Sequence, residues 1–154
     1  MKKVLSLLLI LSLCFCLISC AEQVTYTFYK DKSEITSIQL VKITEEIWDD
    51  NSDYIVDYKM ESLKAVMDIN NFLNEFSSLI CVRIDFLPGM ELFEGEYGIK
   101  INYNDNSYEL IGYSGGMYYK DGKYTLPEKC ISFDEDEFNA FIEGYITYEN
   151  QFEI

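Results

Sequence analysis

The centre of the chain reads Ile99-Lys100-Ile101-Asn102-Tyr103-Asn104-Asp105-Asn106-Ser107-Tyr108-Glu109-Leu110. Apolar and polar residues alternate before Asp105-Asn106 and again after it, which is the pattern of strands with one buried face. Asp105-Asn106 suits a two-residue turn that needs positive φ. The stretch therefore predicts an antiparallel hairpin whose register separates apolar from polar side chains. The predicted pairs are Tyr103 with Tyr108, Ile101 with Leu110, and Asn102 with Glu109 on the polar face.

Further strands are predicted on both sides of this hairpin. Asp121-Gly122 lies between two tyrosine-containing runs and predicts a second hairpin of the same kind. Closer to the N-terminus, alternating or apolar residues predict strands over 24–29, 35–43, 54–58 and 81–87. Turns are predicted at Asp31-Lys32-Ser33, in the acidic segment Glu45–Asp53 and at Pro88-Gly89.

Two helices are predicted from apolar residues that recur at spacings of three and four. Asp68 is a good N-cap for the first helix, although a start at Ser62 stays open. Asp134 caps the second helix, roughly Asp134 to Tyr148, and Glu137 three positions on resembles a capping box. The apolar stripes are Ile69, Phe72, Leu73, Phe76, Leu79 and Ile80, and then Phe138, Phe141, Ile142, Tyr145 and Ile146. This order predicts an α+β fold, an antiparallel meander sheet with two amphipathic helices packed on it.

The charge of the chain restricts its partners. It has 27 acidic and 12 basic residues among 154, no histidine, and a formal net charge of −15. Such an acidic protein would be repelled by nucleic acid, so we expect no nucleic-acid partner. Absent histidine removes the commonest general base and the usual Ser/His and Cys/His nucleophile systems, so no catalytic residue is assigned and no cofactor is expected.

The first twenty residues carry the pattern of a secreted and lipidated protein. Lys2 and Lys3 precede the apolar run Val4–Ile18, and Ser19 then precedes Cys20. This order resembles the signal peptide and lipobox of bacterial lipoproteins. The resemblance implies cleavage after residue 19, lipidation of the Cys20 sulfur, and a mature domain, 20–154, held at the cell membrane and facing outside the cytoplasm. A spanning helix needs roughly 20 apolar residues, which disfavours a transmembrane anchor; an ordinary signal peptide is the other alternative.

The mature region contains an isoleucine-rich strand from Ile35, a helix start at Asp68 and a Phe-Asp-Glu-x-Glu-Phe segment at Phe133. In these motifs it is similar to the small uncharacterised α+β lipoproteins of low-GC bacteria. These motifs are structural, and they imply a fold without implying an activity.

Two cysteines of the mature region, Cys81 and Cys130, form a candidate disulfide. Disulfides persist outside the cytoplasm, and this one would close a loop of about 50 residues, worth roughly 4 kcal/mol in the chain-entropy model. The alternative is two buried free thiols, since both residues lie in apolar surroundings. Two cysteines without histidine make a poor zinc site.

No metal site is predicted elsewhere either. Asp49, Asn51 and Asp53 imitate the first ligand positions of a calcium-binding EF-hand loop. The pattern then fails, because Tyr54 replaces the glycine of the sharp turn and Met60 replaces the bidentate glutamate.

Thirteen tyrosines are many for this chain, and a tyrosine on a strand covers one face of the core while its hydroxyl reaches water. The alternative is a recognition surface made of clustered, exposed tyrosines. Tyrosine supplies contact area at low entropic cost, and it is enriched at protein interfaces. The candidate residues are Tyr113, Tyr118, Tyr119 and Tyr124. We therefore expect a non-enzymatic binding module that meets an envelope protein, a peptide or a cell-wall component. The alternative is a hydrolase that cleaves wall glycans with a pair of carboxylates.

Overall fold

The computed structural model describes residues 23–49, 55–84, 92–125 and 130–148. Within these ranges the chain is mostly antiparallel sheet with two α-helices, which agrees with the predicted α+β class. The predicted leader, Cys20 and the turn predicted at Pro88-Gly89 lie outside the described residues. None of the helices in the described ranges is both long enough and apolar enough to cross a membrane.

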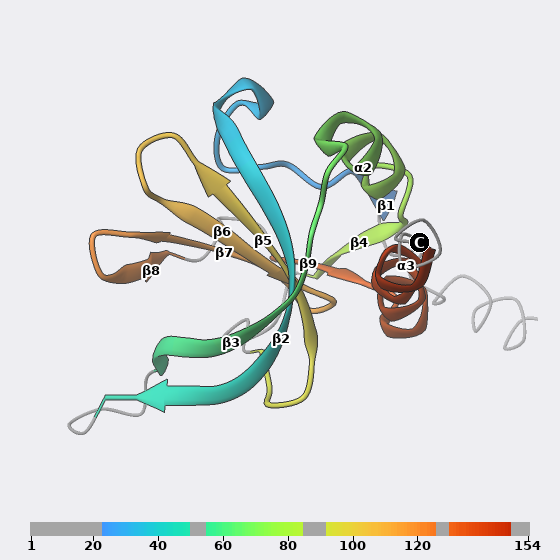
Figure 1. The fold of residues 1–154 in the computed structure, drawn as a ribbon. Helices are drawn as coiled ribbons and strands as arrows, with labels where there is room; N and C mark the ends of the chain where they lie inside the picture. The colour runs from blue at the N-terminus through green and yellow to red at the C-terminus, as the bar shows by residue number, and fades with distance from the viewer. Residues whose placement is uncertain (1–22, 50–54, 85–91, 126–129, 149–154) are drawn as a thin grey trace, which may run out of the picture.

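The strands form two sheets (Figure 1). The smaller sheet has the order β1-β4-β9, with β1 (Gln23–Val24), β4 (Cys81–Ile84) and β9 (Cys130–Phe133). The larger sheet has the order β3-β2-β5-β6-β7-β8, with β2 (Ile35–Trp48), β3 (Ile55–Ala65), β5 (Tyr97–Tyr103), β6 (Tyr108–Gly112), β7 (Gly115–Lys120) and β8 (Lys123–Thr125). All neighbouring strands in both sheets pair antiparallel.

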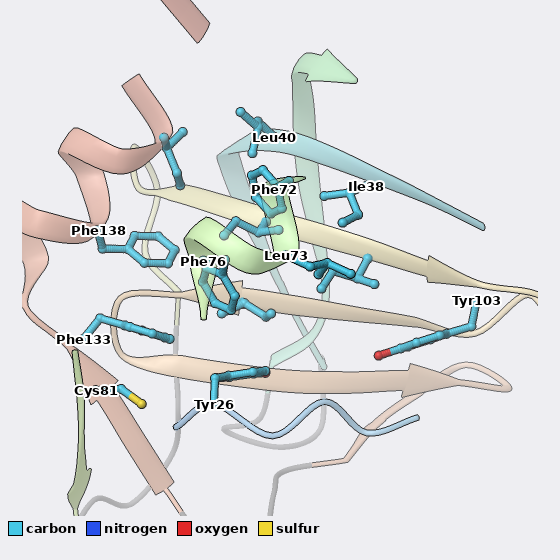
Figure 2. Packing of buried hydrophobic residues seen from close by; sticks show 14 residues of the cluster. Tyr26, Ile38, Leu40, Phe72, Leu73, Phe76, Cys81, Tyr103, Phe133 and Phe138 are labelled. Atoms are coloured by element: carbon cyan, nitrogen blue, oxygen red, sulfur yellow. The ribbon is translucent and has the colours of Figure 1, made fainter. Parts of the chain in front are cut away.

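Buried side chains cover both faces of the larger sheet. One face, which we call the helix face, packs against α2 (Ile69–Phe76), α3 (Glu135–Tyr148) and the smaller sheet. Phe76, Phe133 and Phe138 point toward one another in Figure 2. The centroid of the Phe133 ring lies 5.4 Å from the centroid of the Phe76 ring and 5.3 Å from that of the Phe138 ring. The opposite face, the far face, carries a second cluster of Val41, Ile43, Tyr58, Leu92, Leu110 and Met117.

The larger sheet curls around the far face, so that its outermost strands, β3 and β8, contact each other. The rings of Tyr58 on β3 and Tyr124 on β8 meet edge to face, with centroids 5.6 Å apart. The Tyr124 hydroxyl also donates to Asp57 Oδ1 at 3.3 Å. Tyrosine side chains therefore join the two edges of the sheet.

Both helices start where the sequence predicts. The Asp68 carboxylate accepts from the Asn71 amide at 3.0 Å, and the Asp134 carboxylate accepts from the Glu137 amide at 3.0 Å. The first helix is shorter than predicted, because it ends at Phe76 and Ile80 is half exposed. The Ser77 hydroxyl donates to the Leu73 carbonyl, and a serine that bonds the backbone in this way competes with helix continuation.

The central hairpin forms, but its predicted register is wrong. The Tyr103 amide donates to the Ser107 carbonyl at 2.9 Å, and Asn106 has φ 66°. These are the features of a three-residue loop over 104–106 that ends in a left-handed residue. The pairs are consequently Ile101 with Glu109, Lys100 with Leu110 and Asn102 with Tyr108. A shift of one residue turns a side chain to the other face of a sheet, so Glu109 enters the core.

The second hairpin matches its prediction. Lys120 pairs with Lys123, which leaves Asp121 and Gly122 as a two-residue turn with φ of 51° and 81°. Positive φ at both positions is the requirement of the hairpin turn that fits the twist of the strands.

Three predictions closer to the N-terminus need correction. The predicted strand over 24–29 is paired only at Gln23–Val24, and the chain then crosses the helix face without regular structure. A short 3-10 helix capped by Asp31 replaces the predicted turn. β2 continues through the acidic segment to Trp48 as the strand partner of β3, and Glu45 lies opposite Lys59 and forms an exposed ion pair with it. The Asn51 and Asp53 positions lie outside the described residues.

Candidate functional site

A buried carboxylate, Glu109 on β6, lies at the centre of the polar contacts on the helix face. Its side chain is fully buried. Oε1 accepts a short hydrogen bond from the Tyr26 hydroxyl. Oε2 accepts from the Tyr103 hydroxyl at 2.6 Å and from the Tyr29 amide at 3.3 Å. Three donors therefore replace the water that a surface carboxylate would bind.

Burial controls the protonation of this cluster. The loss of solvent raises the pKa of Glu109 above its ordinary value, and the hydrogen bonds from Tyr103, Tyr26 and the Tyr29 amide oppose that shift. Burial and the neighbouring Glu109 carboxylate raise the pKa of Tyr26 and of Tyr103 as well. Both hydroxyls therefore keep their protons and remain donors at neutral pH.

Gly116 on β7 makes room for the contact between Tyr26 and Glu109. A Cβ at position 116 would lie 1.9 Å from the Tyr26 hydroxyl oxygen and 3.4 Å from Glu109 Oε1. Glycine is the residue that allows such close approach of a side chain to the backbone.

A second polar network surrounds the hairpin loop at the surface. The Tyr118 hydroxyl donates to Ser107 Oγ at 2.9 Å, and the Ser107 hydroxyl donates to Asp105 Oδ1. Asp105 pairs with Lys30 at 2.7 Å and with Lys120 at 3.1 Å. The hydrogen bond from Lys30, followed by that from Ser107, lowers the pKa of Asp105. The hairpin loop therefore joins the N-terminal segment to β7.

The far face carries a second group of tyrosines, Tyr108, Tyr119 and Tyr124, which we call the tyrosine patch. The rings of Tyr108 and Tyr119 are stacked with centroids 4.6 Å apart, and the Tyr124 ring lies 4.8 Å from that of Tyr119. The hydroxyls of Tyr108 and Tyr124 are 2.7 Å apart. Burial raises the pKa of Tyr108 to about 12. All three side chains are partly exposed, so the tyrosine patch is a surface feature held by its own contacts.

Charged groups flank the tyrosine patch. Lys100 Nζ lies 4.2 Å from the centroid of the Tyr108 ring, within the range of a cation–π contact. Burial lowers the pKa of Lys100, and Asp57 acts in the opposite direction. The patch therefore presents aromatic area, hydroxyls, one cation and one carboxylate.

The structure separates the four tyrosines predicted as one surface. Tyr119 and Tyr124 come together on the far face, whereas Tyr118 faces the helix face and stacks on Tyr29 at 4.8 Å. Tyr113 is half-buried against the helix-face core. Tyr108 belongs to the patch, but the sequence analysis missed it, because the incorrect register placed it on the apolar face opposite Tyr103. A three-residue loop over 104–106, in place of the predicted two-residue turn, would have placed Tyr108 on the same face as Tyr119 and Tyr124.

The two cysteines lie on neighbouring strands, β4 and β9, but at different positions along them. Cys81 is a buried free thiol whose Sγ donates to the Val24 carbonyl at 2.8 Å, and burial raises its pKa. The register pairs Cys81 with Phe133 and Ile84 with Cys130. Three residues of strand are about 10 Å, whereas a disulfide needs Cα atoms within about 7 Å. The register therefore disfavours a disulfide between Cys81 and Cys130.

Metal binding finds no support in the ranges that the structure covers. Those residues contain no group of three or more histidine, cysteine, aspartate or glutamate side chains that could hold a metal ion.

Comparison with known proteins adds no assignment: no family model, no curated protein and no solved structure matches this chain. The function of the chain must therefore be argued from the geometry of its own residues.

Replacing Gly116 with alanine should displace Tyr26 from Glu109 and lower the free energy of unfolding by about 1–3 kcal/mol, the cost of an unsatisfied buried polar group. Gly144→Ala is the matched control, because its Cβ meets nothing within 4 Å in the exposed part of α3. That change should stabilise the helix by about 0.5–1 kcal/mol. Urea unfolding of both variants measures the difference, and equal effects would contradict the steric role of Gly116.

The raised pKa of Glu109 predicts a pH dependence of stability. The folded state holds this proton more tightly than the unfolded chain does, so its contribution is complete below the ordinary pKa of 4.5 and is lost as pH rises through the folded-state value. The stability of the wild type relative to Glu109→Gln should therefore fall as pH rises above 4.5. A difference that stays constant or rises over this range would show that the pKa of Glu109 is not raised.

Proposed function

We propose that this chain is a lipid-anchored, extracytoplasmic binding protein without enzymatic activity, and that the tyrosine patch is its ligand-binding surface. The ligand is an envelope protein, a peptide or a cell-wall component. The anchor is the acylated Cys20, and the domain that follows it is a meander sheet with two amphipathic helices packed on one face.

The observation that carries this proposal is that the side chains of the tyrosine patch hold one another in place. The ring stack of Tyr108 on Tyr119 and the contact between the hydroxyls of Tyr108 and Tyr124 fix three partly exposed aromatic side chains. Side chains already held in one conformation lose less entropy on binding, which increases affinity. Tyrosine also combines apolar area with a polar end, and it is frequent among the residues that dominate binding energy.

The burial of side chains in α2 and α3 supports the proposal that two amphipathic helices pack on one face of the sheet. Phe72, Leu73 and Phe76 are the buried residues of α2, and Phe138 and Ile142 are buried in α3. The exposed first turn of α3 is acidic instead, with Glu135, Asp136 and Glu137. Each helix therefore buries one side and leaves another to solvent.

The position of the carboxylates supports binding over glycan hydrolysis. Two carboxyl groups, Glu109 and Glu96, have a raised pKa by burial. Glu109 is fully buried with both oxygens occupied, and Glu96 precedes β5 by one residue. Glu109 pairs with Ile101, and Ile101 lies five residues beyond Glu96 in the chain. Five residues of strand separate the two carboxylate positions by roughly 17 Å. Glycosidases need carboxyl groups about 5–10 Å apart.

The tyrosine patch is tested by Tyr119→Ser in the full, anchored chain. Loss of a ring at the centre of an interface typically weakens binding at least tenfold, so capture of envelope proteins or of purified cell wall should fall by about that factor. Tyr119→Phe keeps the ring and should retain capture.

Tyr97→Ser is the matched control for the Tyr119 change, because Tyr97 is also half-buried but packs against the helix-face core. It should leave capture unchanged if folding is intact, which circular dichroism checks. Equal capture by wild type and Tyr119→Ser would remove the tyrosine patch as the binding surface.

Lipidation is tested at Cys20 itself. Cys20→Ala removes the sulfur to which the acyl group would be attached, so metabolic labelling with a fatty acid should be lost and the protein should be released or remain as precursor. Acyl chains contribute roughly 0.8 kcal/mol for each buried methylene, which is why their loss should free the chain from the membrane. Unchanged labelling of the variant would contradict the anchor.

A further inference from the structure

The ends of β2 and β3 form a two-stranded projection, residues 44–49 and 55–60, which we call the arm. β5 pairs with β2 only as far as Lys42, and the loop before β5 adds two hydrogen bonds at Ile43. Beyond that point β3 is the strand partner of β2 within the described residues. Figure 1 shows the two strands running together away from the rest of the sheet, at the lower left.

The arm exposes apolar side chains at its outer end. Trp48 is 46% exposed and Val56 is 42% exposed. Trp48 pairs with Ile55, the residue before Val56, so both exposed side chains lie at the same end of the arm. A ribbon of two strands has too little core to cover such side chains, and exposed tryptophan is enriched where proteins bind partners.

The charge of the arm is strongly acidic. It carries the carboxylates Glu45, Glu46, Asp49 and Asp57 and one cation, Lys59, which gives a formal charge of 1 − 4 = −3. The Trp48 indole N–H donates to Glu46 Oε2 at 3.2 Å, so a carboxylate lies directly beside the exposed ring. A complementary surface would be apolar where it meets Trp48 and Val56 and cationic around them.

We propose that the arm is a docking surface for a basic protein segment that carries apolar side chains between its lysines or arginines. This deepens the proposed binding function and rests on it for the existence of a partner. A membrane is the less suitable occupant, because anionic headgroups would repel the four carboxylates. Asp57 accepts from Tyr124, so the arm adjoins the tyrosine patch.

The single tryptophan of the chain, Trp48, reports directly on this surface. The full chain, anchored in vesicles of zwitterionic lipid, is titrated with a ten-residue peptide of alternating Lys and Val. We expect a saturable blue shift of tryptophan emission. Alternating Glu and Val should give no shift because of its charge, and alternating Lys and Ser should give none because it lacks apolar side chains.

Variants separate the two components of recognition. Val56→Thr keeps a β-branched residue in the strand and should weaken the Lys-Val peptide about fourfold, the equivalent of one lost apolar group. Glu46→Gln keeps an acceptor for the indole and removes one charge, so it should weaken binding and reduce its dependence on salt. Ile80→Thr is the matched control, because Ile80 is 50% exposed and lies between α2 and β4, outside the arm; it should change nothing.

Several outcomes would overturn this inference. One is an equal shift with the Glu-Val peptide, and another is unchanged affinity in both Val56→Thr and Glu46→Gln. Quenching of Trp48 by brominated lipid before any peptide is added would assign the arm to the membrane instead. Tyr119→Ser distinguishes the two proposals, since a failure of the tyrosine patch would leave the shift of Trp48 intact.

Discussion

The helix face of the larger sheet depends on one buried carboxylate. Glu109 on β6 binds Tyr26 and the Tyr29 amide from the N-terminal segment and Tyr103 from β5. The N-terminal segment has almost no backbone pairing, so these side-chain bonds replace the ladder that a strand would form. A buried charge is tolerated when several donors surround it, and removal of any of those donors leaves the carboxylate unsatisfied. Glu109 therefore attaches the N-terminal segment, which is more than 75 residues away in sequence, to the hairpin of β5 and β6.

The same constraint explains the small residue at position 116. The Tyr26 hydroxyl reaches Glu109 across β7, and a side chain on that strand would occupy its path. A separate polar network runs from Tyr118 through Ser107 and Asp105 to two lysines. The core of this face is thus apolar beneath the helices and polar beneath the N-terminal segment, with the boundary at Tyr26.

The two faces of the sheet serve different purposes in the proposed function. The helix face is covered by α2, α3 and the smaller sheet. The far face carries the tyrosine patch and is continued by the arm, where Trp48 and Val56 remain exposed. Asp57 connects them, because it belongs to the arm and accepts from Tyr124. A partner that contacts both would meet aromatic and acidic groups together.

The sequence by itself determined the class of the fold, the caps at Asp68 and Asp134, and the turn at Asp121-Gly122, because each follows from local spacing and from the backbone preferences of single residues. Only the tertiary structure decided the register at Tyr108 and Glu109, since two-residue and three-residue loops fit the same letters and differ by one position. That one position determined which tyrosines gather on the far face and which carboxylate is buried. The length of β2 was also decided by its partner, because pairing with β3 holds acidic residues in a strand that their composition alone would assign to a turn.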